Sequence, residues 1–472
     1  MKFRSLFAIL LCGFAGVACM PATSAGTHDM GAMPGTGPGM ETDTMPTGHA
    51  GHGEAPANDP PIHHPAMGHS ADSTDTMPHE MWMHPLGAGW NLAAMAQAYP
   101  IVTASMPFDD DNLLSETDPY LTQPAIMADV IGPGSKVVFR TTLNFEGITI
   151  EDGEATFGGW GEGFIDRRHP HTLLHEAMLS LNFWELGGGM ASLSAGKGFA
   201  PYGTDDPMSR PGLKYPTNHH LSQILERWVV SGAYLNRGWG LEAGVFGGSE
   251  PEGPYDLSNI ESFGDSWSVR LSRRFGAPGQ PTAAPWELSA SFARVQESHG
   301  PEVATTKLIN LAVRHEQDYD FGNLYGLAEA SRSDPEDGDG YFSILGETRL
   351  ERGSHQPYIR LEYATRPEYD RLGVAGTDDF FRYDHDSHAH GATRWLISTV
   401  GYGYELTGFP VSARPFVEAQ HFRVSEERGG IDPQQLYGSD SFWGLSAGFR
   451  VFIGGDPMRM GNYGIFDAMV MK

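Results

Sequence analysis

From about Trp90 onward, the chain alternates apolar and polar side chains with a period of two residues. Successive side chains of a β-strand point to opposite faces, so this pattern is typical of strands whose two faces differ chemically. The clearest run has one face of Val137, Phe139, Leu143 and Phe145 and an opposite face of Arg140, Thr142, Asn144 and Glu146. The pattern therefore predicts sheet structure for most of the chain.

Other runs repeat this alternation. Three are equally clean, namely Trp267 to Phe275, Ile359 to Tyr363 and Trp443 to Val451. Less regular runs lie near 90–104, 173–184, 190–199, 223–236, 239–247, 285–295, 304–315, 322–331, 341–350, 393–405 and 413–424. Some connectors are short and rich in glycine, which supplies a positive φ. Others are long and polar, notably Ala200 to Ser222 and Pro367 to Gly391.

These runs indicate a membrane barrel more than a soluble sandwich. No stretch after the N-terminus has the roughly 20 apolar residues of a spanning helix. Several runs reach the roughly 9–11 residues of a spanning strand, whereas sandwich strands are usually shorter. Aromatic residues lie at their ends: Trp184, Trp228, Trp239, Trp286, Trp395 and Trp443. We predict an all-β fold, a transmembrane antiparallel β-barrel of about 14–16 strands, with a β-sandwich as the alternative.

The N-terminus has the features of an export signal. Lys2 and Arg4 precede an apolar run from Leu6 to Ala18, and small residues follow. The only two cysteines, Cys12 and Cys19, lie in or beside this signal, so a mature chain would hold no internal disulfide. Lipidation of Cys19 is an alternative to plain cleavage near residue 25. We expect a signal peptide over 1–25, a disordered tail over 26–88 and the outer-membrane barrel over 89–472.

The tail is rich in Gly, Pro, Met, His, Ser and Thr and has no periodic apolar pattern, so we expect it to be disordered when unliganded. No lysine or arginine occurs between Ser5 and Ser135. The whole chain carries a formal net charge of −28. This charge argues against a nucleic-acid partner and favours attraction of cations.

Histidine and methionine are interleaved along the tail. Imidazole suits Cu(II), Zn(II) and Ni(II), and thioether sulfur selects Cu(I), so the mixture favours copper as the cofactor. The candidate ligands are His49, His52, His63, His64, Met67, His69, Met77, His79, Met81, Met83 and His84. The alternative is that the tail is only a solvated spacer, because the ligand spacings are irregular.

A second histidine cluster lies in the connector before residue 391. His388 and His390 are two residues apart and face the same way in an extended segment, so they could share an ion with Asp386. The alternative is an exposed acidic loop. His169 and His171, and His219 and His220, are interpreted as loop or rim histidines. No nucleophile elbow, phosphate loop or zinc-protease motif is present, so we predict that the chain is not an enzyme.

Two stretches resemble a known family. His175-Glu176-Ala177-Met178-Leu179-Ser180-Leu181 and Ser194 to Gly203 resemble the strand and turn of the porin O/P-like outer-membrane porins, with Met178 in place of an aromatic residue. The tail resembles, in composition, that of the copper resistance protein B family. These resemblances imply an outer-membrane location and a channel. The basic, anion-selecting pore of the porin O/P-like family is not evident here, and the run closing at Phe452 fits as a last strand.

The alternation assigns charged residues to the inner face of the barrel. The predicted pore-lining residues are Arg140, Glu146, Arg227, Arg270, Arg274, Arg360, Glu362, Glu418 and Arg450. We expect a porin-like channel for small polar solutes or ions, with outer-membrane lipid and the barrel-assembly machinery as partners and a homotrimer as an open option. One alternative is a copper-binding, copper-resistance outer-membrane protein with a narrow or plugged pore. Another is an adhesin or structural barrel without conductance.

Overall fold

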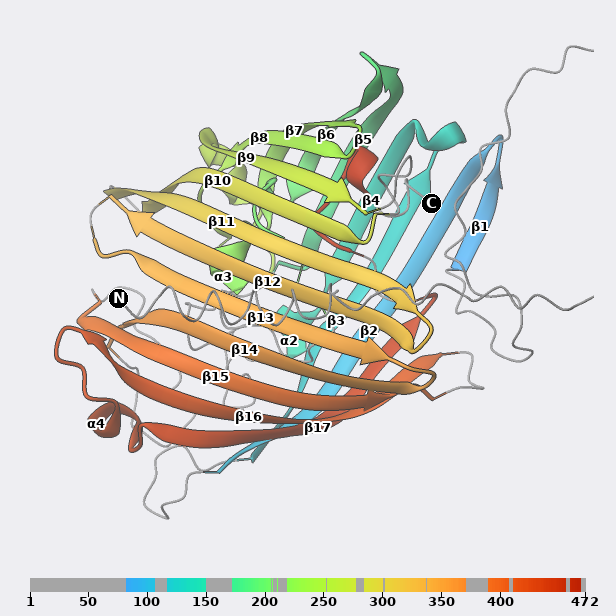
Figure 1. Cartoon of the computed structure of the whole chain (residues 1–472). Coiled ribbons are helices and arrows are strands. Elements are labelled where there is room, and N and C mark those ends of the chain that lie inside the picture. The colour runs from blue at the N-terminus through green and yellow to red at the C-terminus, as the bar shows by residue number, and fades with distance from the viewer. Residues whose placement is uncertain are drawn as a thin grey trace, which may run out of the picture. The chain divides into compact units, whose positions relative to one another are not determined.

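A computed structural model gives the fold. It describes residues 82–106, 117–149, 172–204, 206, 210, 219–251, 253–276, 284–299, 302–336, 338–370, 389–406, 411–455 and 459–467. These residues form one antiparallel sheet of seventeen strands, β1 to β17 (Figure 1). The predicted signal peptide and the tail as far as Met81 lie outside the described residues.

Sixteen of the strands close into a barrel. They are β2 (Trp90–Met106), β3 (Thr117–Ile131), β4 (Val137–Asn144), β5 (Leu174–Leu186), β6 (Gly189–Gly198), β7 (Arg227–Asn236), β8 (Trp239–Gly247), β9 (Phe263–Phe275), β10 (Trp286–His299), β11 (Glu302–Tyr319), β12 (Gly322–Pro335), β13 (Tyr341–Glu351), β14 (His355–Glu368), β15 (Gly391–Tyr404), β16 (Ser412–Arg428) and β17 (Ser441–Ile453). Each pairs with its neighbour in sequence, and β17 pairs with β2, for example Leu445 with Ala104. The prediction of an all-β barrel with about 14–16 strands is confirmed.

The extra strand, β1 (Trp82–Gly87), forms a hairpin with the start of β2. It pairs with β2 as far as Ala94, and β17 takes over the same edge of β2 from Ala96. The backbone N–H of Trp82 donates to the carbonyl of Gly454 at 3.0 Å, so β1 continues the line of β17. The sheet thus begins at Trp82, within the segment assigned above to the tail. All six residues of β1 are exposed, so burial imposes no alternation on them.

The barrel is apolar outside and polar inside. On β9, Trp267 and Leu271 are exposed on the outer face while Arg270 is buried on the inner face. On β14, Ile359 and Leu361 are outside and Arg360 is inside. Closure pairs the backbone groups of every barrel strand with neighbours on both sides, which is the condition for a sheet to cross a bilayer. Together these features form the architecture of an outer-membrane protein.

The two ends of the barrel differ. At one end the strands are joined by tight turns, such as Gly187 and Gly188 between β5 and β6. At the other end the connections 145–173, 199–226 and 369–390 are long. In outer-membrane barrels the short turns face the periplasm. The helices α2 (Glu146–Thr149), α3 (His219–Ser222), α4 (Pro433–Tyr437), η1 (Pro133–Ser135), η5 (Ser258–Ser262) and η8 (Gly464–Phe466) are short. In the described part of the chain, none of the helices has the length and apolar character needed to cross a membrane.

Candidate functional site in the barrel lumen

Arginine and carboxylate pairs line the inner wall of the barrel. The guanidinium of Arg140 donates to Asp129 at 2.6 and 2.9 Å. The guanidinium of Arg270 donates to Glu242 at 2.7 and 2.8 Å. Arg360 donates to Glu347 at 2.8 Å. All these side chains are buried. Each cation therefore meets an anion on a neighbouring strand, which offsets part of the cost of removing both charges from water.

The other predicted pore-lining residues also lie on the inside. Arg274 pairs with Glu287 at 2.7 Å. Arg227 pairs with Glu250 at 2.7 Å. Glu418 accepts a hydrogen bond from Tyr358 at 2.6 Å, Arg450 donates to the Tyr99 hydroxyl at 3.2 Å, and Glu362 is buried.

Glu146 differs from its prediction in one respect. The alternation placed it on a strand, but β4 ends at Asn144 and Glu146 begins α2. Its side chain is still buried and accepts a hydrogen bond from Thr122 at 2.6 Å. The chain turns here because the Asn144 side chain accepts the backbone N–H of Glu146 at 2.9 Å, a local contact that competes with strand pairing.

The described residues of the connection between β6 and β7, namely 199–204, 206, 210 and 219–226, lie inside the barrel, and we call them the inner loop. Its helix α3 contacts β12 (Figure 1). The backbone N–H of Gly203 donates to Ser291 on β10 at 2.9 Å, and Arg210 donates to Glu329 on β12 at 3.2 Å. On the other side, Arg450 of β17 donates to the carbonyl of Arg210 at 3.2 Å. The inner loop therefore reaches walls far from its own strands in both directions around the barrel.

A glycine fixes the fold of the inner loop. Gly203 has φ +70°, a conformation that L side chains rarely adopt, and a Cβ there would lie 1.5 Å from the carbonyl oxygen of Ser222. The two halves of the loop run close together at this point, where the N–H of Ala200 also donates to the carbonyl of Ile224 at 3.0 Å. Only glycine allows this approach.

From the opposite end, residues 459–467 enter the lumen after β17, and we call them the lumen segment. Met460, Tyr463, Ile465 and Phe466 are buried. Met460 packs with Met95 and Met127 on β2 and β3. Ile465 and Phe466 pack around Leu235, with Trp184 and Met190 beside them. Within 459–467 the only regular element is η8, so this segment adds no strand to the barrel.

Polar side chains of the lumen segment bind the charged wall. Asp467 pairs with Arg140 at 2.8 Å, and Arg459 pairs with Glu287 at 2.9 Å. Asn462 accepts from Arg270 at 2.8 Å. Tyr463 donates to Glu176 on β5 at 2.7 Å. Four of the lumen segment's side chains are thus attached to β4, β5, β9 and β10.

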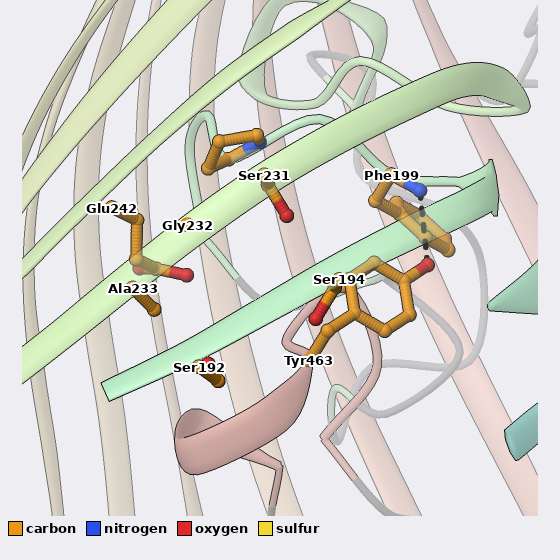
Figure 2. Close-up of a pocket in the computed structure, with 10 residues that line it drawn as sticks. Ser192, Ser194, Phe199, Ser231, Gly232, Ala233, Glu242 and Tyr463 are labelled. Atoms are coloured by element: carbon orange, nitrogen blue, oxygen red, sulfur yellow. Dashed lines mark hydrogen bonds between the residues drawn. The ribbon is translucent and has the colours of Figure 1, made fainter. Parts of the chain in front are cut away.

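The inner loop and the lumen segment meet in the lumen. The backbone N–H of Phe199 donates to the Tyr463 hydroxyl at 3.0 Å, drawn as a dashed line in Figure 2. The N–H of Asp206 donates to the carbonyl of Met460 at 3.4 Å. Beside this junction lies a cavity of about 10 Å³, lined by Ser192, Ser194, Pro201, Glu242 and other residues, which is room for about one water molecule.

Small wall residues make room for the lumen segment. A Cβ on Gly240 of β8 would lie 2.6 Å from the Phe466 ring, and one on Gly198 would lie 2.2 Å from the Tyr463 oxygen. A Cβ on Gly464 would lie 2.2 Å from the Ser192 oxygen. The alternation places Gly240 and Gly198 on the inner face of the barrel, but it does not indicate which part of the chain packs against them. The one sequence signal that could have revealed the lumen segment is the aromatic and apolar stretch Tyr463 to Phe466 after the last alternating run.

An apolar cluster also lies inside the barrel. Trp395, Phe422, Tyr437 and Phe442 pack together with Leu221 of the inner loop. Trp395 is fully buried, so it is not a lipid-facing aromatic at a strand end as the sequence indicated. The two-residue period explains this outcome, because Trp395 shares a face with Thr393 and Ile397, both of which are buried.

The two stretches on which the family resemblance was based come together on β5 and β6. Glu176 accepts hydrogen bonds from Thr142 at 2.5 Å and from Tyr463. Lys197 donates to Thr172 at 2.5 Å and to the carbonyl of Leu174 at 3.0 Å. His175 hydrogen bonds with Glu226 at 2.6 Å. Glu176 thus holds the lumen segment to β5 and His175 holds the end of the inner loop to β5, whereas Lys197 joins β6 to the start of β5.

Most candidate metal ligands fall outside the described residues, namely His49, His52, His63, His64, Met67, His69, Met77, His79, Met81, Asp386 and His388. Met83 and His84 lie on β1. His390 pairs with Asp370 at 2.8 Å, and both side chains are exposed. Among the residues that are described, no three His, Cys, Asp or Glu side chains gather in a way that could hold a metal ion.

Comparisons with known proteins concern the fold. No protein-family model matches the chain, and no curated protein matches it. The structure is similar to OmpF of Salmonella typhi in complex with daunomycin, with 12% identity, a TM-score of 0.44 and coverage of 77% of this chain and 98% of that chain. It is also similar to an anion-selective porin from Comamonas acidovorans, with 11% identity, a TM-score of 0.43 and coverage of 77% and 99%. Similarity at this level concerns the fold alone, so the function of the lumen has to be inferred from the residues of this chain.

Proposed function

We propose that this chain is a channel of the porin type for small polar solutes or ions. The observation that carries the proposal is the charged inner wall. Arg140, Arg270 and Arg360 face inward from three different strands, and each pairs with a carboxylate on the neighbouring strand. A barrel that served only as a membrane anchor could fill its interior with apolar side chains at lower cost, because buried ion pairs carry a desolvation penalty. Charged side chains on the wall of a pore interact with polar solutes and ions and so determine which of them pass.

The two segments inside the lumen fit the same proposal. Porin-type selectivity needs a constriction narrow enough that solutes feel the charges of the wall. The inner loop narrows the lumen, since its residue Arg210 is buried there and binds Glu329 of β12. Both the inner loop and the lumen segment are attached mainly by side chains, whereas the strands are joined by backbone pairing.

The test is flux through reconstituted protein. Liposomes containing the full chain, and liposomes containing a variant that lacks residues 456–472, are loaded with sugars of increasing size and with potassium chloride. We expect efflux of small polar solutes and ions from at least one preparation, with a size limit. Absence of any flux from both preparations, with circular dichroism showing folded sheet, would overturn the channel proposal.

A second proposal concerns copper and is favoured by the sequence of the tail, where histidine and methionine are interleaved. Cu(I), Cu(II) and Zn(II) are titrated into the full chain and into a variant without residues 26–80. Copper binding that disappears with this deletion supports the proposal, and equal binding by both proteins rejects it. Replacing Met83 and His84 by alanine in the full chain tests whether the start of β1 contributes ligands.

A further inference from the structure

We propose that the lumen segment, residues 459–467, is a removable plug that closes the channel by meeting the inner loop, and that the channel conducts fully when this segment leaves the lumen. This inference rests on the proposed channel function. It adds a regulatory element that is separate from the barrel wall. Four observations support it.

The first observation is the way in which the lumen segment is held. Besides the Ile465 N–H, which donates to the Ser192 hydroxyl at 3.3 Å, its polar contacts with the barrel are made by the side chains of Arg459, Asn462, Tyr463 and Asp467. Residues 459–467 have no strand pairing with the wall. A segment of this kind can detach without breaking the backbone ladder that keeps the barrel closed, because that ladder already includes a direct pairing of β17 with β2.

The second observation is that the wall keeps its own charge partners. Arg140 is bound by Asp467 of the lumen segment and also by Asp129 of the wall at 2.6 Å. Arg270 is bound by Asn462 and also by Glu242. Release of the lumen segment therefore leaves both arginines paired with carboxylates. This matters because an unpaired buried charge would cost several kcal/mol.

The carboxylates of the wall that bind the lumen segment also have partners on the wall. Glu287 is bound by Arg459 of the lumen segment and also by Arg274 of the wall at 2.7 Å. Glu176 is bound by Tyr463 and also by Thr142 at 2.5 Å. Each of these carboxylates thus keeps one partner on the wall when the segment is absent, which favours a plug that can be removed.

The third observation is the shape of the wall. Gly240 and Gly198 lack the side chain that would collide with Phe466 and Tyr463. Ser192 and Ser194 are small polar residues on the same part of the wall, and Figure 2 shows them beside Tyr463. Glycine within a strand marks a close approach of another part of the chain. When the lumen segment leaves, the space beside these small residues is vacated.

The fourth observation is the junction itself. The lumen segment enters from the short-turn end and the inner loop from the long-loop end, and they join through Phe199 and Tyr463 at 3.0 Å. Apolar residues surround this junction, including Ile224 and Val229. The lumen segment and the inner loop together close the lumen, so loss of the lumen segment would leave the inner loop alone at this point.

Single-channel currents in planar bilayers test the proposal with three proteins: the full chain, the variant lacking residues 456–472, and Gly240→Ala. The alanine methyl group would lie 2.4 Å from the Ser272 hydroxyl, which can turn to another rotamer, and 2.6 Å from the Phe466 ring, so it displaces the plug and leaves the chain at full length. We expect a several-fold higher mean conductance for the deletion and a higher open fraction for Gly240→Ala. Gly232→Ala, on the outer face of neighbouring β7, is the control for replacing a strand glycine, because its methyl group would have its nearest neighbour at 3.9 Å, and its currents should equal those of the full chain.

The outcomes separate the two proposals. Equal, non-zero currents from all of these proteins overturn the plug and leave the channel function standing. Absence of current from every protein, with β-sheet circular dichroism intact, overturns the channel function and the plug with it. If the deletion variant fails to fold, Gly240→Ala against Gly232→Ala decides alone, and equal open fractions in that pair reject the plug.

Discussion

The phenol of Tyr463 donates a hydrogen bond of 2.7 Å to the carboxylate of Glu176, and this bond joins the lumen segment to β5. Burial and then the nearby Glu176 carboxylate raise the pKa of Tyr463 well above its ordinary value. The phenol therefore stays protonated and keeps donating at physiological pH. The same oxygen accepts the N–H of Phe199, so one side chain connects three parts of the lumen.

Tyr463→Phe should loosen the lumen segment without removing it. The substitution leaves the Glu176 oxygen and the Phe199 N–H without this partner, which costs about 1–3 kcal/mol for a buried group. We expect a lower thermal midpoint in detergent by circular dichroism and a higher open fraction in bilayer recordings.

Tyr437→Phe is the matched control for this substitution. The Tyr437 hydroxyl also donates to a buried carboxylate, that of Glu368, at 2.7 Å, and it accepts from Arg366 at 2.9 Å. Tyr437 lies on α4, and the apolar cluster to which it belongs contains no residue of the lumen segment. Its loss should lower the thermal midpoint to a similar degree and leave the currents unchanged. An equal rise in open fraction for both variants would contradict the specific role of Tyr463.

Gly203→Ala should release the inner loop. The added methyl group would lie 1.5 Å from the Ser222 oxygen, and φ +70° is unfavourable for alanine. The loop would have to refold or leave the wall, which should raise the conductance and make the chain easier to cut by a protease between residues 199 and 226. Gly188→Ala is the control for backbone strain without a steric collision. Gly188 has φ +79°, but no atom lies within 4 Å of its Cβ position. It should lower stability by only about 1 kcal/mol, with no new cleavage.

The sequence predicted the barrel well because lipid and the lumen impose opposite polarities on alternate residues. On β9 and β14 the assigned faces match the structure residue by residue. The alternation failed at β3, which carries Pro119 and Pro124 and has positive φ at Gln123. Such breaks disturb the period, so this strand had no clean pattern to detect.

The contents of the lumen could not be predicted in the same way. An inward arginine has the same two-residue period whether it faces water or a folded segment, so the pattern for Arg140 and Arg270 could not reveal Asp467 and Asn462. Those contacts join residues far apart in the sequence, 327 positions for Arg140 and Asp467. No local pattern encodes such a distance. The aromatic type of Trp395 suggests a lipid-facing position at a strand end, whereas its place in the alternation puts it on the inner face, where it is buried.

On the outer surface of the barrel, the cost of a charged side chain should depend on its depth in the membrane. Leu361 lies near the middle of β14 on the outer face and is exposed. Leu361→Arg should destabilise insertion by about 2–4 kcal/mol, whereas an arginine near the interface costs only about 0–1 kcal/mol. Tyr404→Arg, at the end of β15, is the matched control. Folding yields into lipid vesicles, measured by circular dichroism, should fall only for Leu361→Arg. Equal yields would argue that this face does not meet the bilayer core.

The pair of Arg270 and Glu242 gives a test of how the wall selects ions. Arg270→Gln removes one positive charge from the lumen, so the reversal potential in a potassium chloride gradient should move toward cation selectivity, and Glu242→Gln should move it the opposite way. Each single change also leaves a buried charge without its main partner, at a cost of about 3–5 kcal/mol. The double variant removes both charges and should return the reversal potential close to that of the unmodified chain, with a smaller loss of stability than either single variant, because no lone charge remains. If all three variants keep the original reversal potential while the protein conducts, ions do not pass close to this pair, and the permeation path must follow another part of the wall.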